Sequence, residues 1–209
     1  PETDQIRQVA MNLLGNGLYD AEHHEEALSV EEVNLSLMRR LGAPEQDVLT
    51  AQSNLAATYQ QMGLKEQAVN MERDVYFGYL KLNGEEHEDT LRAATNYARS
   101  LCALQRFKEA KSVLRRTLSV ARRVTRDSSE LSIKMRTLYA QSLYEDDAAT
   151  LDGLREAATT LEDAVQIARR VLGGAHPVTM GIEGSLRNAR AALAAREMPD
   201  ETPPTSNNA

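Results

Sequence analysis

A short pattern recurs along this chain at a constant interval, and the interval restricts the folds that the chain can adopt. Asn54-Leu55-Ala56, Asn96-Tyr97-Ala98 and Leu138-Tyr139-Ala140 follow one another at steps of 42 residues. When Gly15 is aligned with the three alanines, an earlier copy appears 41 residues upstream. Self-similarity with a period of about 20 to 50 residues is typical of stacked supersecondary units. The sequence therefore predicts a repeat array.

The spacing within each copy predicts a pair of helices. A second small residue follows the first after 12 positions, as Ala27, Ala68 and Ala110. Small residues on one helix face let a neighbouring helix approach closely, and Gly63, between Ala56 and Ala68, is a typical helix end. Each copy is thus predicted to be an antiparallel helical hairpin. The predicted first helices span residues 4–20, 46–62, 88–104 and 129–146, and the second helices span 23–41, 65–82, 107–124 and 154–171.

These helices divide the chain into repeat units and a tail. The array is expected over residues 1–197, with units at about 4–42, 46–84, 88–126 and 129–174. Pro177 opens a further helix, expected to cap the array over residues 177–197, because proline suits the first turn of a helix. Residues 198–209 contain three prolines and almost no apolar side chain, so we expect a disordered tail there.

The fourth unit departs from the pattern, because 17 residues separate Ala140 from Ala157. The extra residues lie around Asp146, Asp147 and Asp152 and predict a longer turn within this hairpin. Such a turn could contact a partner, gather carboxylates around a cation, or simply be solvated.

The charge balance and the amino-acid usage exclude several kinds of function. The net charge is -7, whereas nucleic-acid binders usually carry a basic excess, so we expect no nucleic-acid partner. No apolar run approaches the roughly 20 residues of a membrane span, and no signal peptide is visible. Cys102 is the single cysteine, so no internal disulfide can form. We therefore expect a soluble cytoplasmic protein without membrane insertion.

The residues capable of chemistry do not converge in the sequence. The histidines are dispersed at His23, His24, His87 and His176, which does not resemble a set of metal ligands. Cys102 has no identifiable base near it, and no glycine-rich loop that could hold phosphate is present. We therefore expect no catalytic residue, no metal, no cofactor and no enzymatic activity.

Several of the recurring residues carry a resemblance to a known family. Leu41-Gly42, Asn54-Leu55-Ala56, Tyr59, Gly63 and Ala68 resemble the 42-residue tetratricopeptide (TPR) repeat of kinesin light chains. The segments at residues 84–91 and 172–179 are similar to the inter-repeat segment of that family. The resemblance implies an all-α, right-handed α-solenoid with about four hairpins and a C-terminal capping helix. It also implies a concave groove, lined by the first helices, that receives a peptide from a partner protein.

The same register predicts which side chains line the groove. In such repeats the groove stripe lies six, three and two positions before the small residue and one position after it. The predicted peptide-binding residues are Asn16, Asn54, Arg92, Asn96, Arg99, Lys134 and Gln141. Carboxamides can pair with a peptide backbone, and the cations can bind acidic side chains or a terminal carboxylate. The alternative is that these cations pair with nearby Asp or Glu of the same chain.

Two functional classes are compatible with these predictions. The chain could be a scaffold or adaptor that holds a peptide segment of a partner, possibly an acidic one, as the kinesin light chain-like repeats imply. It could instead be the recognition or self-association region of a larger sensor or signalling protein.

Overall fold

The computed structural model describes residues 2–125 and 129–197, with side chains from residue 6 onward. These ranges contain nine α-helices and no strand. The helices are α1 (Glu2–Asp20), α2 (His24–Leu41), α3 (Glu45–Gln61), α4 (Lys65–Asn83), α5 (Glu88–Ala103), α6 (Phe107–Val124), α7 (Glu130–Tyr144), α8 (Leu151–Leu172) and α9 (Pro177–Glu197). The predicted tail at 198–209 and the end of the third unit at residue 126 lie outside the described residues.

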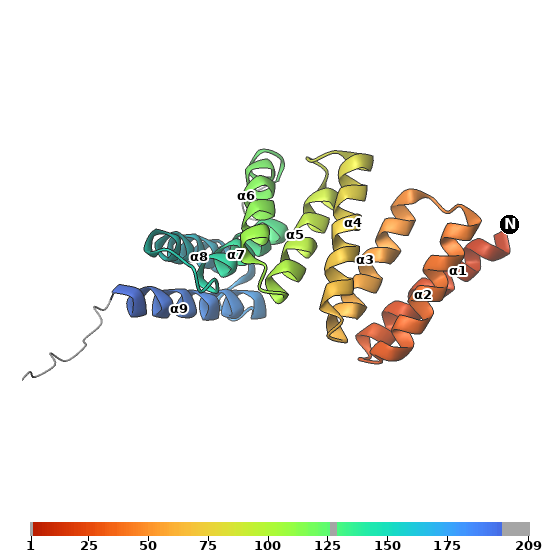
Figure 1. Cartoon of the computed structure of the whole chain (residues 1–209), viewed down its shortest axis with the longest axis horizontal. Coiled ribbons are helices and arrows are strands. Elements are labelled where there is room, and N and C mark those ends of the chain that lie inside the picture. Colours follow the sequence, from red (N-terminus) through yellow and green to blue (C-terminus); the bar gives the residue numbers. More distant parts are fainter. Residues whose placement is uncertain (1, 126–128, 198–209) are drawn as a thin grey trace, which may run out of the picture.

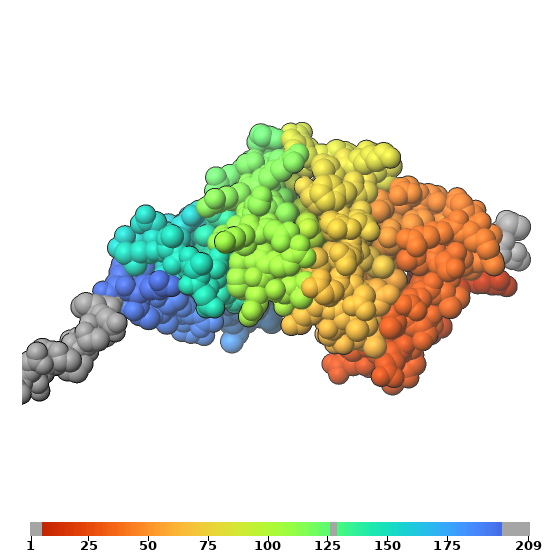
Figure 2. Space-filling view, viewed as in Figure 1, coloured from red at the N-terminus to blue at the C-terminus, as the bar shows by residue number. Residues whose placement is uncertain are grey.

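The helices form an α-solenoid of four antiparallel hairpins and a final helix (Figure 1). Each helix packs against the next one along the chain. First helices also contact first helices of neighbouring units, since α1 touches α3, α5 touches α7, and α7 touches α9. The space-filling view shows the repeats as successive bands in sequence order (Figure 2). The helix α9 therefore occupies the place that the first helix of a fifth unit would take.

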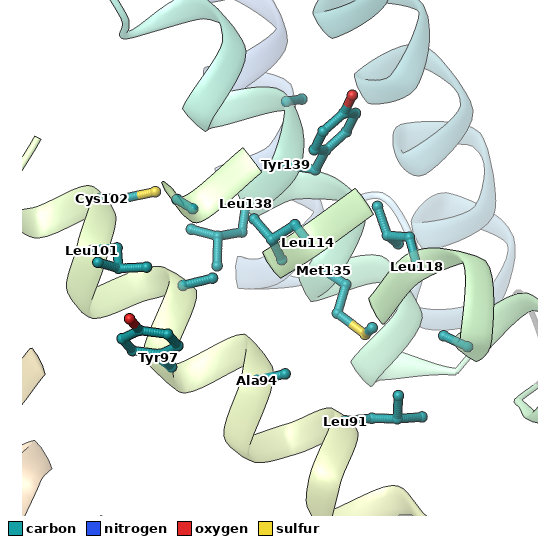
Figure 3. Close-up of a cluster of buried hydrophobic side chains, with 14 of the residues drawn as sticks. Leu91, Ala94, Tyr97, Leu101, Cys102, Leu114, Leu118, Met135, Leu138 and Tyr139 are labelled. Atoms are coloured by element: carbon teal, nitrogen blue, oxygen red, sulfur yellow. The ribbon is translucent and has the colours of Figure 1, made fainter. Parts of the chain in front are cut away.

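The recurring small residues are all buried between the helices of the array. Ala56, Ala98 and Ala140 are at most 1% exposed, and the small residues of the second helices, Ala27, Ala68, Ala110 and Ala157, are fully buried. Larger side chains fill the spaces beside them. Figure 3 shows Leu101 of α5, Leu114 of α6 and Met135 of α7 among the side chains of this core. The positions that recur along the sequence are thus the positions that are buried in the core.

The turn inside each of the first three hairpins uses a residue in the left-handed region. Gly63 has φ 75°, and the matched residues Glu22 and Gln105 have φ values of 63° and 58°. In each turn the next amide donates to a carbonyl five residues back, as Leu64 N does to Tyr59 O. The turn geometry is therefore shared, although only one of the three residues is a glycine.

The turn of the fourth hairpin is longer, and some of the extra residues belong to the start of α8. Residues 145–150 separate α7 from α8, and α8 begins at Leu151, three residues before the predicted start. The Thr150 hydroxyl caps α8 by accepting a hydrogen bond from the Gly153 amide at 3.1 Å. Asp146 binds Lys111 Nζ at 2.7 Å, and this contact lowers the pKa of the carboxyl group. Asp146 is thus paired within the chain.

Two carboxylates occupy matched positions inside the array. Glu31 of α2 and Glu72 of α4 each follow the small residue of their helix by four positions, and they are 8% and 1% exposed. The third and fourth units have Leu114 and Leu161 at this position. Burial raises the pKa of Glu72 to about 8, while the charge of Arg99 acts in the opposite direction. Glu72 is therefore mostly protonated at neutral pH.

We expect Gly63→Ala to lower the free energy of unfolding by about 0.5–1 kcal/mol, because a Cβ is strained at positive φ. Nothing lies within 4 Å of the added Cβ, so the effect comes from the backbone alone. Gln105→Gly should raise the stability by a similar amount, and urea denaturation measures both. Gly181→Ala, inside α9 and equally unobstructed, is the control and should stabilise. A loss of stability in all three variants would contradict the expectation.

We expect the stability to fall as the pH rises from about 4.5, the ordinary pKa of Glu, to about 8. Over this range the unfolded chain releases a proton that folded Glu72 retains, with a slope of up to about 1.4 kcal/mol per pH unit. Glu72→Gln should show a smaller decline, which urea denaturation at about pH 5, 6.5 and 8 measures. Glu66→Gln, exposed on the same helix, should follow the parent chain. Parallel pH profiles for Glu72→Gln and the parent would refute the assignment.

Candidate peptide-binding groove

Three helices at first-helix positions of successive units line a groove. The helices α5, α7 and α9 form a depression of about 610 Å³. Its lining residues are Glu88, Arg92, Thr95, Asn96, Arg99, Glu130, Leu131, Ile133, Lys134, Thr137, Leu138, Gln141, Val178 and Ile182. A depression of this size can hold a few side chains of an extended peptide.

Five of the seven predicted site residues meet in this depression. Arg92, Asn96 and Arg99 come from α5, and Lys134 and Gln141 come from α7. Residues spaced by four and seven positions lie on one face of a helix, so the register that buries Ala98 turns these three α5 side chains toward α7. The structure thus brings together the predicted groove residues of the third and fourth units.

The floor of the depression is apolar, and part of it was missed by the sequence analysis. Ile133, Leu138 and Ile182 are buried, and Leu131 and Val178 are half-buried. Val178 and Ile182 belong to α9, which was expected only to cap the array. Val178 and Ile182 are four residues apart, just after Pro177, and this spacing could have indicated an apolar face of the helix. The floor offers a contact for an apolar side chain beneath a charged rim.

Two of the three cations have carboxylate partners on their own helices. Arg92 binds Glu88 at 2.6 Å and Lys134 binds Glu130 at 2.7 Å, with all four side chains more than half exposed. Lys134 lowers the pKa of Glu130 through this contact. Exposed ion pairs contribute only about 0–1 kcal/mol, so a partner's carboxylate can replace them at little cost. Arg99 has no hydrogen-bond or ion-pair partner among the residues that the structure describes.

The carboxamides are partly engaged within the chain. Gln141 Nε2 donates to Glu145 at 2.9 Å, and Asn96 Nδ2 donates to Ser53 at 3.5 Å. Each amide group has a second N–H and a carbonyl oxygen, which can still pair with a peptide backbone.

Asn16 and Asn54 lie in a different part of the array. Asn54 Nδ2 donates to Asn16 Oδ1 at 3.1 Å, and both residues line a small cavity among α1, α2 and α3. This cavity also contains Glu31 and Asn34 of α2, which the sequence analysis did not select because it considered only first helices. Glu31 follows Ala27 by four positions, where the third and fourth units have a leucine. A charged residue at this buried position could have been noticed in the sequence.

Other kinds of site find little support in the described ranges. Across residues 2–125 and 129–197, no three His, Cys, Asp or Glu side chains gather as they would around a metal ion. In the same ranges no helix is both long enough and apolar enough to cross a membrane. Cys102 is buried, and burial raises its thiol pKa to about 12, which is unfavourable for a nucleophile.

Comparison with known proteins identifies the repeat type. A tetratricopeptide repeat family model matches residues 48–89 and 90–126. A search of curated proteins finds no match to the chain. Among solved structures, a kinesin light chain-type protein of Podosopora anserina with nearly identical TPR-like repeats aligns with a TM-score of 0.77 and 20% identity. The alignment covers 94% of this chain and 90% of that one.

Two further structures share the architecture. BtubC (BKLC) from P. vanneervenii aligns over all of this chain and 89% of its own length, with a TM-score of 0.69 and 16% identity. A Rap protein complexed with competence and sporulation factor aligns over 91% of this chain and 54% of its own length, with a TM-score of 0.55 and 16% identity. At these identities the likeness concerns the fold. The chain thus has the α-solenoid fold of tetratricopeptide repeat proteins, and its second and third units match the tetratricopeptide repeat model.

Proposed function

We propose that the chain is a protein-interaction scaffold and that its groove at α5, α7 and α9 holds an acidic peptide segment of a partner. The observation that carries this proposal is the meeting of Arg92, Arg99 and Lys134 above an apolar floor. The chain as a whole is acidic, so this local group of cations stands out from its surroundings. Acidic and apolar side chains in one short segment would match both parts of the depression.

The partly free carboxamides support an extended peptide as the ligand. Asn96 and Gln141 can each donate to and accept from a peptide backbone, whatever its side chains are. Charged side chains would then select among peptides that the backbone contacts hold in place. The Rap structure, which is complexed with competence and sporulation factor, supports the use of this fold in binding another molecule.

The double charge reversal Arg92→Glu with Arg99→Glu should weaken the binding of an acidic peptide at least about tenfold. One charge-assisted hydrogen bond contributes about 1.5–3 kcal/mol, and about 1.4 kcal/mol corresponds to a tenfold change in Kd. The probes are fluorescein-labelled dodecapeptides selected on the parent protein from a random library, and fluorescence anisotropy measures their Kd. Thermal unfolding should change little, because both arginines are exposed.

The matched control is Arg39→Glu with Arg40→Glu, which makes the same charge change at the exposed end of α2. This control should bind the selected peptides as the parent does, apart from a small electrostatic effect that added salt removes. Equal weakening by both double variants would place the binding outside the groove. A selection without enrichment in Asp or Glu would refute the acidic ligand.

Self-association is a second proposed function, and the exposed face of α1 supports it. Ile6, Val9, Leu13 and Leu14 are all more than half exposed. Exposed aliphatic side chains that cluster on one helix often mark an interaction surface. A second copy of the chain could cover these side chains.

If α1 mediates self-association, the parent chain should show a concentration-dependent increase in mass by sedimentation equilibrium. Leu13→Glu should reduce that association at least about tenfold, because it places a charge in an apolar contact. Leu82→Glu, at another exposed leucine on α4, is the control and should associate as the parent does. A parent chain that stays monomeric over the whole concentration range would refute this second function.

A further inference from the structure

A second polar site lies among α1, α2 and α3, in the first two units of the array. It is a small cavity of about 10 Å³, close to the space that one water-sized group occupies. Its lining residues are Asn12, Asn16, Glu31, Asn34, Ala51 and Asn54. Asn16 is exposed, and Asn12 and Asn54 are half-buried, so these three residues form the side of the cavity that is open to solvent.

Two buried oxygen atoms at this cavity have no hydrogen-bond partner among the described residues. They are Glu31 Oε2 and Asn34 Oδ1, and their residues are only 8% and 2% exposed. Asn34 Nδ2 donates to Asn12 Oδ1 at 2.5 Å, and Asn54 Nδ2 donates to Asn16 Oδ1. Both unpartnered atoms are acceptors, and the carboxylate remains an acceptor whichever way the amides are oriented. The cavity therefore requires a hydrogen-bond donor.

The sequence makes room for this carboxylate. Gly15 takes the place that alanine takes in the other three units, and a Cβ there would lie 3.0 Å from Glu31 Cγ. Burial raises the pKa of Glu31, and a hydrogen bond with Thr58 acts in the opposite direction. An unsatisfied buried acceptor is destabilising, so the arrangement weakens the fold unless a donor fills it.

We propose that this cavity receives a primary ammonium group, from a lysine side chain or from the N-terminus of the peptide bound in the groove. An ammonium is compact and carries three donors, whereas a guanidinium is broad and planar. Glu31 Oε2 and Asn34 Oδ1 would accept two of its hydrogen bonds, and the side-chain oxygen of Asn54, which also lines the cavity, would accept the third. This inference rests on the proposed peptide-binding function and adds a second charge requirement to it.

The two sites would then select opposite charges. Arg92, Arg99 and Lys134 favour acidic side chains at α5 and α7, and Glu31 favours a cation at α1 to α3. A bound peptide would then need its ammonium group either before or after its acidic residues in sequence, and only one of the two orders would fit. The charge pattern therefore sets the direction in which the peptide lies.

The first experiment uses methylammonium chloride as the probe and does not depend on peptide binding. Side-chain amide signals of Asn12 and Asn34 in ¹H–¹⁵N spectra are followed during the titration, with sodium chloride as the control for ionic strength. We expect a saturable shift in the parent that is at least about tenfold weaker in Glu31→Gln, which keeps the shape and removes the charge. Glu25→Gln, exposed on the same helix, should behave as the parent does.

Glu31→Leu is a second variant, and it copies the residue that the third and fourth units have at this position. It should also lose the methylammonium response, and thermal unfolding shows that both variants fold. Equal responses in the parent and in both Glu31 variants would overturn the proposal. So would a parent without a saturable response, because the cavity would then hold only water.

The second experiment tests the peptide directly. Lysine is placed in turn at each position of a selected acidic dodecapeptide and compared with norleucine, and free N-termini are compared with acetylated ones. Lysine or a free N-terminus should strengthen binding at least about tenfold on one side of the acidic residues only, and only when Glu31 is present. If acidic peptides bind and lysine has no effect, this inference is wrong and the proposed function stands. If methylammonium binds at Glu31 but no acidic peptide binds, the proposed function fails alone.

Discussion

The close contact between small residues of adjacent helices is the constraint on which the rest of the structure depends. Ala56, Ala98 and Ala140 on the first helices are buried together with Ala27, Ala68, Ala110 and Ala157 on the second helices. These buried positions recur once per hairpin, and small side chains there let neighbouring helices approach closely. Because each repeat packs mainly on its neighbours, the same register is carried from α1 to α9.

The packing register also decides which side chains face the groove. When Ala98 turns toward the core, Arg92, Asn96 and Arg99 fall on the opposite side of α5. The groove surface is therefore free to vary in charge while the contact surface remains small and apolar. This separation explains how an acidic chain can present a group of cations at α5 and α7, and a carboxylate between α1 and α3.

The buried carboxylates show where the array departs from the most stable solution. At the matched position the third and fourth units have Leu114 and Leu161, whereas the first two have Glu31 and Glu72. Burial disfavours the charged form of both carboxylates and raises their pKa values. Residues that cost stability without a structural partner are often kept for binding. Glu31 fits this description better than Glu72, because it borders a cavity with a second unpartnered acceptor.

The sequence by itself determined the helical hairpins, their period and the residues of their closest contacts, because each depends on local spacing along one helix. Gly63 and the small residues were sufficient to place the turns and the packing faces. Only the tertiary structure showed that α9 contributes Val178 and Ile182 to the groove floor, and that Glu31 and Asn34 share a cavity with Asn16 and Asn54. These meetings join helices that are distant in the sequence, and they depend on how the hairpins stack.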